Sequence, residues 1–394
     1  MKLLFIAPSY SYPAVKGYQL MLINHIEQLA PNNSIHLIFF GKNSNPLVDP
    51  ILSLCKKVNI IKLPKWKMAL NLISGFFTKK PFQICLYRSK EMSNLINNTL
   101  KRNSYDGVVF YLSRMAQFIP VDFKGISILN MIDPLVLNYS RSLYWRPWYW
   151  KFLLNIEIAR LVMYEKSFVS KFDCVTLISE MDISDYRKIF KDVNFEQLPY
   201  GVDLDYFSHS DNDLRKPGMI VISGNMGYAP NIDGVKYFCS EVFPLVLVSI
   251  PDAHLWIVGA RPSSSIKKLS KQKNINVTGY VTDIRKFLNY AMVSVCPIRL
   301  NVGTQTKVLE ALAMKVPVVT TSSGNSGVMG VSGSDLIVAD SPAEIAEAVI
   351  SLLRGDKWEL LSQQGKAFVN QNFSWDKSAR KLVYIIKKLN NVED

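Results

Sequence analysis

A lysine and a glutamate stand three residues apart in the segment 301–320, and together they could hold a phosphate and a pair of hydroxyl groups. Apolar residues at helical spacing predict a short helix that starts near Lys307. A helix start offers unpaired N–H groups and the positive end of the dipole, where phosphate binds. Glu310 can accept hydrogen bonds from vicinal hydroxyls such as those of a ribose. The segment therefore indicates a nucleotide, unless Glu310 only complements the helix dipole.

The elements that position this segment alternate between predicted strands and helices, which is typical of a parallel α/β sheet with ligands at the carboxyl ends of its strands. In the first half we expect helices at 18–30 and 152–171, and a carboxylate, Asp133, directly after a strand. The expected strands are 2–7, 34–40, 59–63, 107–111, 126–132 and 174–179. After a polar linker at 209–217 the pattern restarts, with strands at 219–223, 253–259, 275–278, 293–297, 316–319 and 336–339 and helices at 234–247, 342–354 and 375–389. We expect a loop at 224–233.

Composition favours a folded protein of two domains, since 394 residues exceed one ordinary core. Five scattered cysteines without a CxxC pair and four distant histidines argue against a disulfide framework or a zinc site, and fit a reducing cytosol. The apolar run at residues 3–7 is shorter than the core of a signal peptide, so a buried strand is expected there. No apolar run approaches the ~20 residues that span a bilayer.

The formal charge of +14 calls for an anionic partner, for which nucleic acid, an acidic membrane and phosphate-bearing substrates are the candidates. No zinc finger or RNP-type pattern is present, so no nucleic-acid partner is expected. Two stretches, 65–92 and 143–154, interleave cations with aromatic residues and could contact anionic lipid. They could equally form an amphipathic helix pair with a solvated basic face and a packing surface against a neighbouring domain.

Several segments, read in order, resemble the GT-B glycosyltransferases of family 4, and more narrowly the sugar transferases of bacterial exopolysaccharide and capsule clusters. The segments are 223–238 (SGNMGYAPNIDGVKYF), 253–262 (AHLWIVGARP), 277–285 (VTGYVTDIR) and 303–321 (GTQTKVLEALAMKVPVVTT), with 174–180, 198–207 and 373–382 as weaker matches. The resemblance implies an α/β GT-B fold, in which two doubly wound Rossmann-like domains face a central cleft and the C-terminal helix crosses back. The implied domains are 1–205 with 372–394 for the acceptor and 206–371 for the nucleotide-sugar donor.

The resemblance also implies roles for individual residues. Glu310 matches the second glutamate of the family's E-x7-E motif, which holds the ribose, and Lys307 matches the diphosphate-binding helix start. Gly17 matches a glycine that lets a loop approach the donor phosphates, where a Cβ would obstruct. The implied donor-binding residues are Gly17, Gly224, Asn225, Gly303, Thr304, Gln305, Thr306 and Glu310. The candidate catalytic residues are Asp133, Lys307 and Arg261, and no metal ligand is expected.

Three departures from the family pattern affect this reading. The first glutamate of E-x7-E is replaced by Val302, so recognition of the transferred sugar must differ. Asn225 and Tyr228 stand where the family has a basic pair, so Arg261 and Lys307 would supply the charge. Near Asp133 the histidine of many family members is missing, since Asn130 and Ile132 lie there.

The implied function is a retaining glycosyltransferase of the hexosyltransferase type, which moves a sugar from a nucleoside-diphosphate-sugar to a saccharide or lipid-linked acceptor in bacterial surface polysaccharide biosynthesis. No cofactor or metal is expected. The expected location is cytoplasmic, peripheral at the inner face of the cytoplasmic membrane, with an anionic membrane surface as partner. One alternative is an NDP-sugar 2-epimerase, although this chain lacks the set of histidines and acids that it would need. The other is a non-catalytic GT-B scaffold, an alternative that the substitution at Val302 leaves open.

Overall fold

The computed structural model describes residues 1–41, 49–208, 215–300 and 303–391. Within this part, the chain divides into two compact units, one of Met1–Gly201 with Trp375–Asp394 and the other of Val202–Ser374. The predicted boundaries, 205/206 and 371/372, differ from these by a few residues. Most of the predicted linker, 209–214, lies outside the described residues.

The first unit is built on a seven-stranded parallel sheet with strand order β3-β2-β1-β4-β5-β6-β7. The interior strand β1 is apolar after Lys2 and almost entirely buried, as expected for a parallel sheet covered on both faces. The strands are β1 (Lys2–Ala7), β2 (Ser34–Phe40), β3 (Lys57–Ile61), β4 (Gly107–Tyr111), β5 (Ser127–Ile132), β6 (Cys174–Leu177) and β7 (Phe195–Gln197). Two apolar clusters form the core, one on each face of this sheet.

The helices of the first unit include the last helix of the chain, α16 (Trp375–Leu389), which packs against α1 (Gly17–Leu29). The buried ring of His25 joins them, with Nδ1 2.8 Å from Tyr111 Oη and Nε2 3.0 Å from Ser378 Oγ. Burial lowers the pKa of His25 to about 3, so the ring stays neutral. The other helices are α2 (Lys65–Phe76), α3 (Phe82–Leu86), α4 (Lys90–Arg102), α5 (Leu135–Ser142), α6 (Trp148–Phe168) and α7 (Glu180–Ile189).

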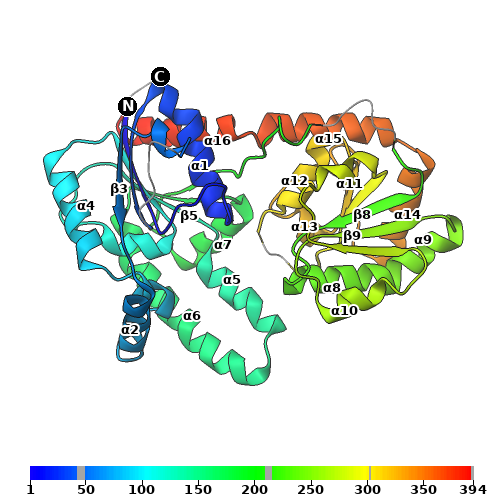
Figure 1. Cartoon of the computed structure of the whole chain (residues 1–394), viewed down its shortest axis with the longest axis horizontal. Helices are drawn as coiled ribbons and strands as arrows, with labels where there is room; N and C mark the ends of the chain where they lie inside the picture. Colours follow the sequence, from blue (N-terminus) through cyan, green and yellow to red (C-terminus); the bar gives the residue numbers. More distant parts are fainter. Residues whose placement is uncertain (42–48, 209–214, 301–302, 392–394) are drawn as a thin grey trace. The chain divides into compact units, whose positions relative to one another are not determined.

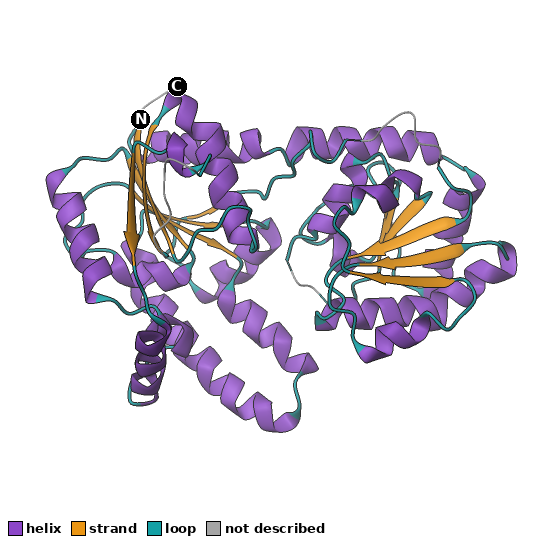
Figure 2. Ribbon diagram, viewed as in Figure 1, coloured by secondary structure: helices purple, strands orange, loops and turns teal. Residues whose placement is uncertain are grey.

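The second unit has a six-stranded parallel sheet with strand order β10-β9-β8-β11-β12-β13, and helices cover both of its faces (Figures 1 and 2). Its strands are β8 (Met219–Ser223), β9 (His254–Val258), β10 (Ile275–Gly279), β11 (Val293–Cys296), β12 (Val318–Thr320) and β13 (Ile337–Val338). Its helices are α8 (Ala229–Tyr237), α9 (Phe243–Ser249), α10 (Ser264–Leu269), α11 (Arg285–Tyr290), α12 (Thr306–Ala313), α13 (Ser322–Asn325), α14 (Pro342–Arg354) and α15 (Trp358–Asn372). Both units are therefore doubly wound and Rossmann-like, as predicted.

Several helices differ from the prediction. The expected loop 224–233 is wrong in its second part, because α8 begins at Ala229 with Pro230 in its first turn, where the fixed φ of proline suits a helix. Helix α6 begins at Trp148 and thus includes two of the clustered tryptophans. Helices α4, α5, α10, α13 and α15 were not expected. Among the described residues, no helix is long and apolar enough to cross a membrane.

Candidate functional site

The carboxyl edge of the second unit's sheet gathers the segments that carry the predicted donor residues. Strands β9, β8 and β11 are neighbours, and each leads at its carboxyl end into one of these segments. The strand order reverses between β8 and β11, which makes this edge a topological switch point. In open α/β sheets, ligands bind in the crevice at such a point.

Two glycines bring the loops after β8 and β9 into direct backbone contact. Gly224 and Gly259 both have positive φ, +142° and +149°. A Cβ on Gly259 would lie 1.7 Å from the Gly224 carbonyl oxygen, so no other residue fits there without moving the loops. A Cβ on Gly224 would lie 2.9 Å from Asn231 Nδ2 and 3.5 Å from Lys307 Nζ. The two glycines therefore hold the Gly224 loop against the start of α12.

Lys307 lies in the first turn of α12, at the positive end of the helix dipole. Its ammonium group donates to Asn231 Oδ1 at 2.6 Å, while Asn231 Nδ2 donates to the Asn225 carbonyl at 2.9 Å. The N-cap residue, Gln305, makes no side-chain capping bond to this helix. A cation at an uncapped helix start is unfavourable by itself, and a bound anion would stabilise both the cation and the N–H groups.

Glu310 lies in the second turn of α12, because the helix begins at Thr306 and its first turn holds no acidic residue. A simple role in complementing the dipole is therefore disfavoured, since that effect falls off after the first turn. Burial raises the pKa of Glu310 to about 7, and Lys307 opposes the shift. In the described part of the chain, the Glu310 carboxylate accepts no hydrogen bond. It is thus available to hydroxyl donors, which would favour its ionised form.

The other predicted donor residues of this unit shape the loops around α12. Asn225 Oδ1 accepts from the Gly227 N–H at 3.0 Å, and Thr304 Oγ1 donates to the Gly327 carbonyl at 3.0 Å. Gln305 is buried and donates to the Gly303 carbonyl at 3.2 Å. Thr306 is the first residue of α12, so its N–H group has no partner within the helix.

Arg261 follows β9 and is exposed, with a positive φ of +56°. Its carbonyl oxygen and Cβ lie against Gly227, where an added Cβ would come within 3.0 Å and 3.2 Å of them. No described residue forms a hydrogen bond or ion pair with its guanidinium. The structure therefore brings Arg261 to the Gly224 loop, beside the segment that contacts Lys307.

The position of Val302, where the family has its first glutamate, lies outside the described residues. The expected consequence for sugar recognition stays a prediction.

Two predicted residues, Gly17 and Asp133, lie in the first unit. Gly17 is the first residue of α1, and a Cβ there would meet only Tyr200 Oη at 3.7 Å, an ordinary contact. Packing within this unit therefore does not require glycine, and its proposed approach to phosphates stays a prediction. Asp133 directly follows β5 and is half-buried. Burial raises its pKa to about 6, with Asp182 adding to the shift and Arg141 opposing it.

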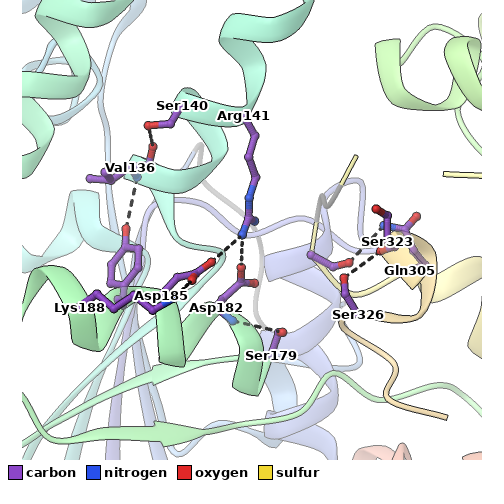
Figure 3. A network of polar contacts seen from close by, with 12 residues as sticks. Val136, Ser140, Arg141, Ser179, Asp182, Asp185, Lys188, Gln305, Ser323 and Ser326 are labelled. Carbon is purple, nitrogen blue, oxygen red and sulfur yellow. Dashed lines mark hydrogen bonds and ion pairs between the residues drawn. The ribbon is translucent and has the colours of Figure 1, made fainter. Parts of the chain in front are cut away.

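Asp182 and Arg141 were missed by the sequence reasoning. Asp182 lies in the first turn of α7, which follows β6, the neighbour of β5 in the sheet. Arg141, in the last turn of α5, donates to Asp182 Oδ1 at 2.9 Å (Figure 3). The pattern Ser179-x-x-Asp182 at the end of a predicted strand was a usable signal for the start of α7, but nothing local pointed to Arg141.

Comparison with known proteins bears on the second unit most directly. Residues 217–355 match the family model described as "Glycosyl transferases group 1". The second unit is a glycosyl transferase group 1 domain. A protein of Klebsiella pneumoniae, described as "Uncharacterized 44.6 kDa protein in cps region", is 21% identical over 370 residues, which cover 89% of this chain and 90% of that protein.

Solved glycosyltransferase structures share the fold over the whole chain. Sucrose-phosphate synthase from Thermosynechococcus elongatus has a TM-score of 0.72 at 14% identity and covers 100% of both chains. Anabaena Alr3699/HepE in complex with UDP has a TM-score of 0.67 at 11% identity, covering 98% of this chain and 100% of that one. WaaG, a glycosyltransferase involved in lipopolysaccharide biosynthesis, has a TM-score of 0.64 at 13% identity, covering 97% and 99%. The predicted GT-B fold and the predicted glycosyltransferase class are confirmed.

Proposed function

We propose that this glycosyltransferase is a retaining enzyme of the hexosyltransferase type that transfers a sugar from a nucleoside-diphosphate-sugar to a saccharide or lipid-linked saccharide acceptor in bacterial surface polysaccharide biosynthesis. The observation that carries the proposal is the pairing on α12. Lys307 lies at the positive helix start, and Glu310 lies one turn further with no hydrogen-bond partner in the described chain. The Lys307 ammonium group at the helix start suits a diphosphate, and the Glu310 carboxylate suits ribose hydroxyls. Retention of configuration follows from the family resemblance.

The relatives support the proposed class of donor and the proposed pathway. Structures of Anabaena Alr3699/HepE with UDP and with UDP-glucose support a uridine nucleotide as the first donor to test. The Klebsiella relative comes from a cps region, which supports a role in surface polysaccharide.

Transfer would proceed by stabilising the diphosphate as it leaves. Negative charge develops on the diphosphate when its bond to the sugar breaks, and Lys307, Arg261 and the N–H groups of α12 would stabilise that charge. Protein cations would perform this task without a metal ion. No group of three His, Cys, Asp or Glu residues in the described chain could hold a metal ion. Asp133, with its pKa raised to about 6, would accept or hold a proton near neutral pH.

An anionic membrane surface is the proposed partner of the first unit. The apolar residues Trp66, Leu70 and Ile73 of α2 and its C-cap residue Phe77 follow one helical stripe and are 56–88% exposed. The start of α6 carries Trp148, Tyr149, Trp150, Phe152 and Leu153, each 52–83% exposed. Neither 62–90 nor 134–156 contains an Asp or Glu, while together they contain ten Lys or Arg residues. Apolar side chains among cations without acids are suited to the interface of an anionic bilayer.

Helices α2 and α6 extend away from the first unit's sheet (Figure 1). They are linked at their base through α3, where the Phe82 N–H donates to the buried Glu157 of α6 at 2.8 Å. The Arg160 guanidinium lies over the Phe82 ring at 4.9 Å. These contacts use the middle turns of α6 and leave its aromatic start exposed. These exposed aromatic and basic residues support our proposal that the enzyme acts at the inner face of the cytoplasmic membrane, where a lipid-linked acceptor would be presented.

The transfer is tested with the purified full chain, a panel of NDP-sugars, and membrane extract as the source of acceptor. We expect nucleoside diphosphate release that depends on the extract and is strongly reduced in Glu310→Gln. Binding of a donor without release under any condition would favour the scaffold, and interconversion of sugars would favour the epimerase.

The membrane partner is tested by flotation with phosphatidylglycerol-containing vesicles at low salt. We expect co-flotation of the wild type, and its loss in a variant that combines Phe77→Ser and Trp148→Ser. Val121→Ser, which changes a residue with 88% exposure outside both helices, should float as the wild type does. Absence of wild-type binding would remove the membrane from the proposal.

A further inference from the structure

The side chain of Asn231 connects Lys307 to the loop that follows β8. Its Oδ1 accepts from the Lys307 ammonium group at 2.6 Å, and its Nδ2 donates to the Asn225 carbonyl at 2.9 Å. An ammonium group can only donate and a carbonyl oxygen can only accept, so these two partners together determine which way the amide faces. Asn231 is also buried, with 9% of its surface exposed. Its amide is therefore held in one orientation, with the oxygen directed at Lys307.

The helix that carries Asn231 is itself fixed to the end of a neighbouring strand. Asn231 lies in the first turn of α8, and Gly234 follows on the same helix. A Cβ on Gly234 would lie 2.4 Å from the Pro297 carbonyl oxygen, directly after β11, so α8 approaches this backbone as closely as glycine allows. Arg299 Nε donates to Asp233 Oδ2 at 2.8 Å and ties α8 to the segment after β11 a second time. Asn231 therefore holds Lys307 from a well-anchored helix.

Glu310 is the partner that Lys307 would otherwise be expected to find. The two residues are three apart on α12, a spacing at which opposite charges on a helix come together. Within the described chain no ion pair joins them: burial raises the pKa of Glu310 to about 7, and the charge of Lys307 offsets this only in part. The ammonium group instead lies against Gly224, where an added Cβ would be 3.5 Å from Nζ. The cation and the carboxylate of α12 are thus kept apart.

A neutral amide is well suited to this task. The lysine side chain is long and flexible, and it loses conformational freedom when a ligand fixes its end. A partner that already fixes the ammonium group in the free protein lowers that cost of binding. A carboxylate in the same place would cancel the charge, whereas an amide oxygen orients the cation and leaves its charge to an anionic ligand.

We propose that Asn231 is a positioning residue that holds the Lys307 ammonium group at the Gly224 loop and away from Glu310, so that the two charged groups of α12 bind different parts of the donor. Lys307 then meets the diphosphate, and Glu310 keeps its oxygens for the ribose hydroxyls. This inference rests on the proposed function, since it assigns a role within the same donor site. Asn231 acts through Lys307 and does not itself need to touch the donor.

A double-mutant cycle on the full chain tests this role, with isothermal titration calorimetry of UDP-glucose at pH 8 as the measurement. Asn231→Leu, which removes both polar ends of the amide, should bind about fivefold more weakly than the wild type, and Lys307→Met about tenfold more weakly. Because Asn231 acts through Lys307, the double variant should bind no more weakly than Lys307→Met alone. Independent effects would multiply to about fiftyfold, and that result would overturn the positioning role.

The pH dependence of binding gives a second measurement, which a change in packing alone would not move. In Asn231→Leu the ammonium group is free to pair with Glu310, and the pair lowers the pKa of that carboxyl. Because pairing competes with protonation, the affinity of Asn231→Leu should fall about threefold between pH 8 and pH 6, compared with about tenfold for the wild type. Equal pH dependence in the two proteins would contradict the separation of the two charges.

Asn274→Leu is the matched control for the loss of an asparagine. Asn274 lies in the same unit and also donates from Nδ2 to backbone carbonyls, those of Pro251 and Ala253, but its bonds do not involve Lys307. This variant should bind UDP-glucose as the wild type does. Thermal unfolding of each variant separates lost binding from lost folding. Asn231→Ser, which is too short to reach Lys307, gives the same comparison if the leucine variant does not fold.

The outcomes for this inference and for the proposed function differ. Unchanged UDP-glucose affinity in a folded Asn231 variant would overturn the positioning role and leave the proposed function intact. A wild type that binds no nucleotide-sugar would overturn the proposed function, and the role of Asn231 with it.

Discussion

The raised pKa of Glu310 predicts that donor binding depends on pH. Burial raises the pKa of the free carboxyl to about 7, so Glu310 is half-protonated at neutral pH before a ligand arrives. Hydroxyl groups of a ribose donate to the ionised form and favour it. Binding below pH 7 should therefore release a proton, and affinity should rise as pH increases through 7.

The size of the effect follows from the fraction of Glu310 that is ionised. With a pKa of about 7, that fraction is about 90% at pH 8 and about 10% at pH 6. Affinity should thus fall about tenfold between pH 8 and pH 6, which is about 1.4 kcal/mol. At pH 6, close to one proton should be released for each ligand bound.

Isothermal titration calorimetry with UDP-glucose measures both quantities, because buffers of different ionisation enthalpy report the released proton. UDP-glucose is preferable to UDP, whose terminal phosphate titrates in the same range. The control is Glu310→Gln, which keeps the shape of the side chain but cannot titrate. It should bind about 1–3 kcal/mol more weakly than the wild type at pH 8, and its affinity should be nearly independent of pH.

Other groups that titrate near neutral pH, Asp133 and Glu165, lie in the first unit and are present in both proteins. The difference between the two pH profiles therefore belongs to Glu310. A wild-type affinity that is flat between pH 8 and pH 6 would refute the reasoning. The same pH slope in Glu310→Gln would refute the assignment of ribose to this residue.

Three further predictions test the framework of the two units. Gly259→Ala should lower UDP-glucose affinity at least tenfold, because the added Cβ would lie 1.7 Å from the Gly224 carbonyl oxygen. The control is Gly333→Ala, which also changes a glycine with positive φ but has nothing within 4 Å of the added Cβ. Lys307→Met should weaken UDP-glucose binding about tenfold and reduce its salt dependence, as salt titration of the affinity would show. Burial raises the pKa of Glu165 from 4.5 to about 8 in the folded protein. Between these two pH values the Glu165 carboxyl is ionised in the unfolded chain but still protonated in the folded one, so the free energy of unfolding falls as the pH rises from 4.5 to 8. Denaturant unfolding should show the wild type losing about 2 kcal/mol between pH 5.5 and pH 7.5, and Glu165→Gln losing little.

The most accurate predictions were for elements whose first and last residues are determined by residues close to them in the sequence. The bounds of α14 were predicted correctly because Ser341 and Glu344 form a capping box around Pro342. The α12 segment could likewise be placed from its apolar spacing, which put Lys307 at the helix start. Parallel strands buried on both faces were visible as short apolar runs.

What could not be predicted depends on pairs of residues far apart in the chain. Arg141 and Asp182 are 41 residues apart, and neither belongs to a motif that would indicate the ion pair. Glu165 and Tyr186 are separated by 21 residues, and a buried glutamate in a helix cannot be distinguished from an exposed one by spacing alone. The charged neighbours of Asp133 could therefore be identified only from the structure, in which β5 and β6 are adjacent in the sheet.

The donor edge of the second unit contains two electrostatic mismatches that one ligand would resolve. Lys307 places a positive charge at the positive end of α12, and Glu310 places a carboxylate where burial disfavours its charge. Each arrangement costs stability in the free protein. An anion at the helix start would stabilise Lys307, and hydroxyl donors one turn further would stabilise ionised Glu310. A nucleoside diphosphate presents both groups at once, so these two unfavourable charge placements would give selectivity for a ligand that carries phosphate and ribose together.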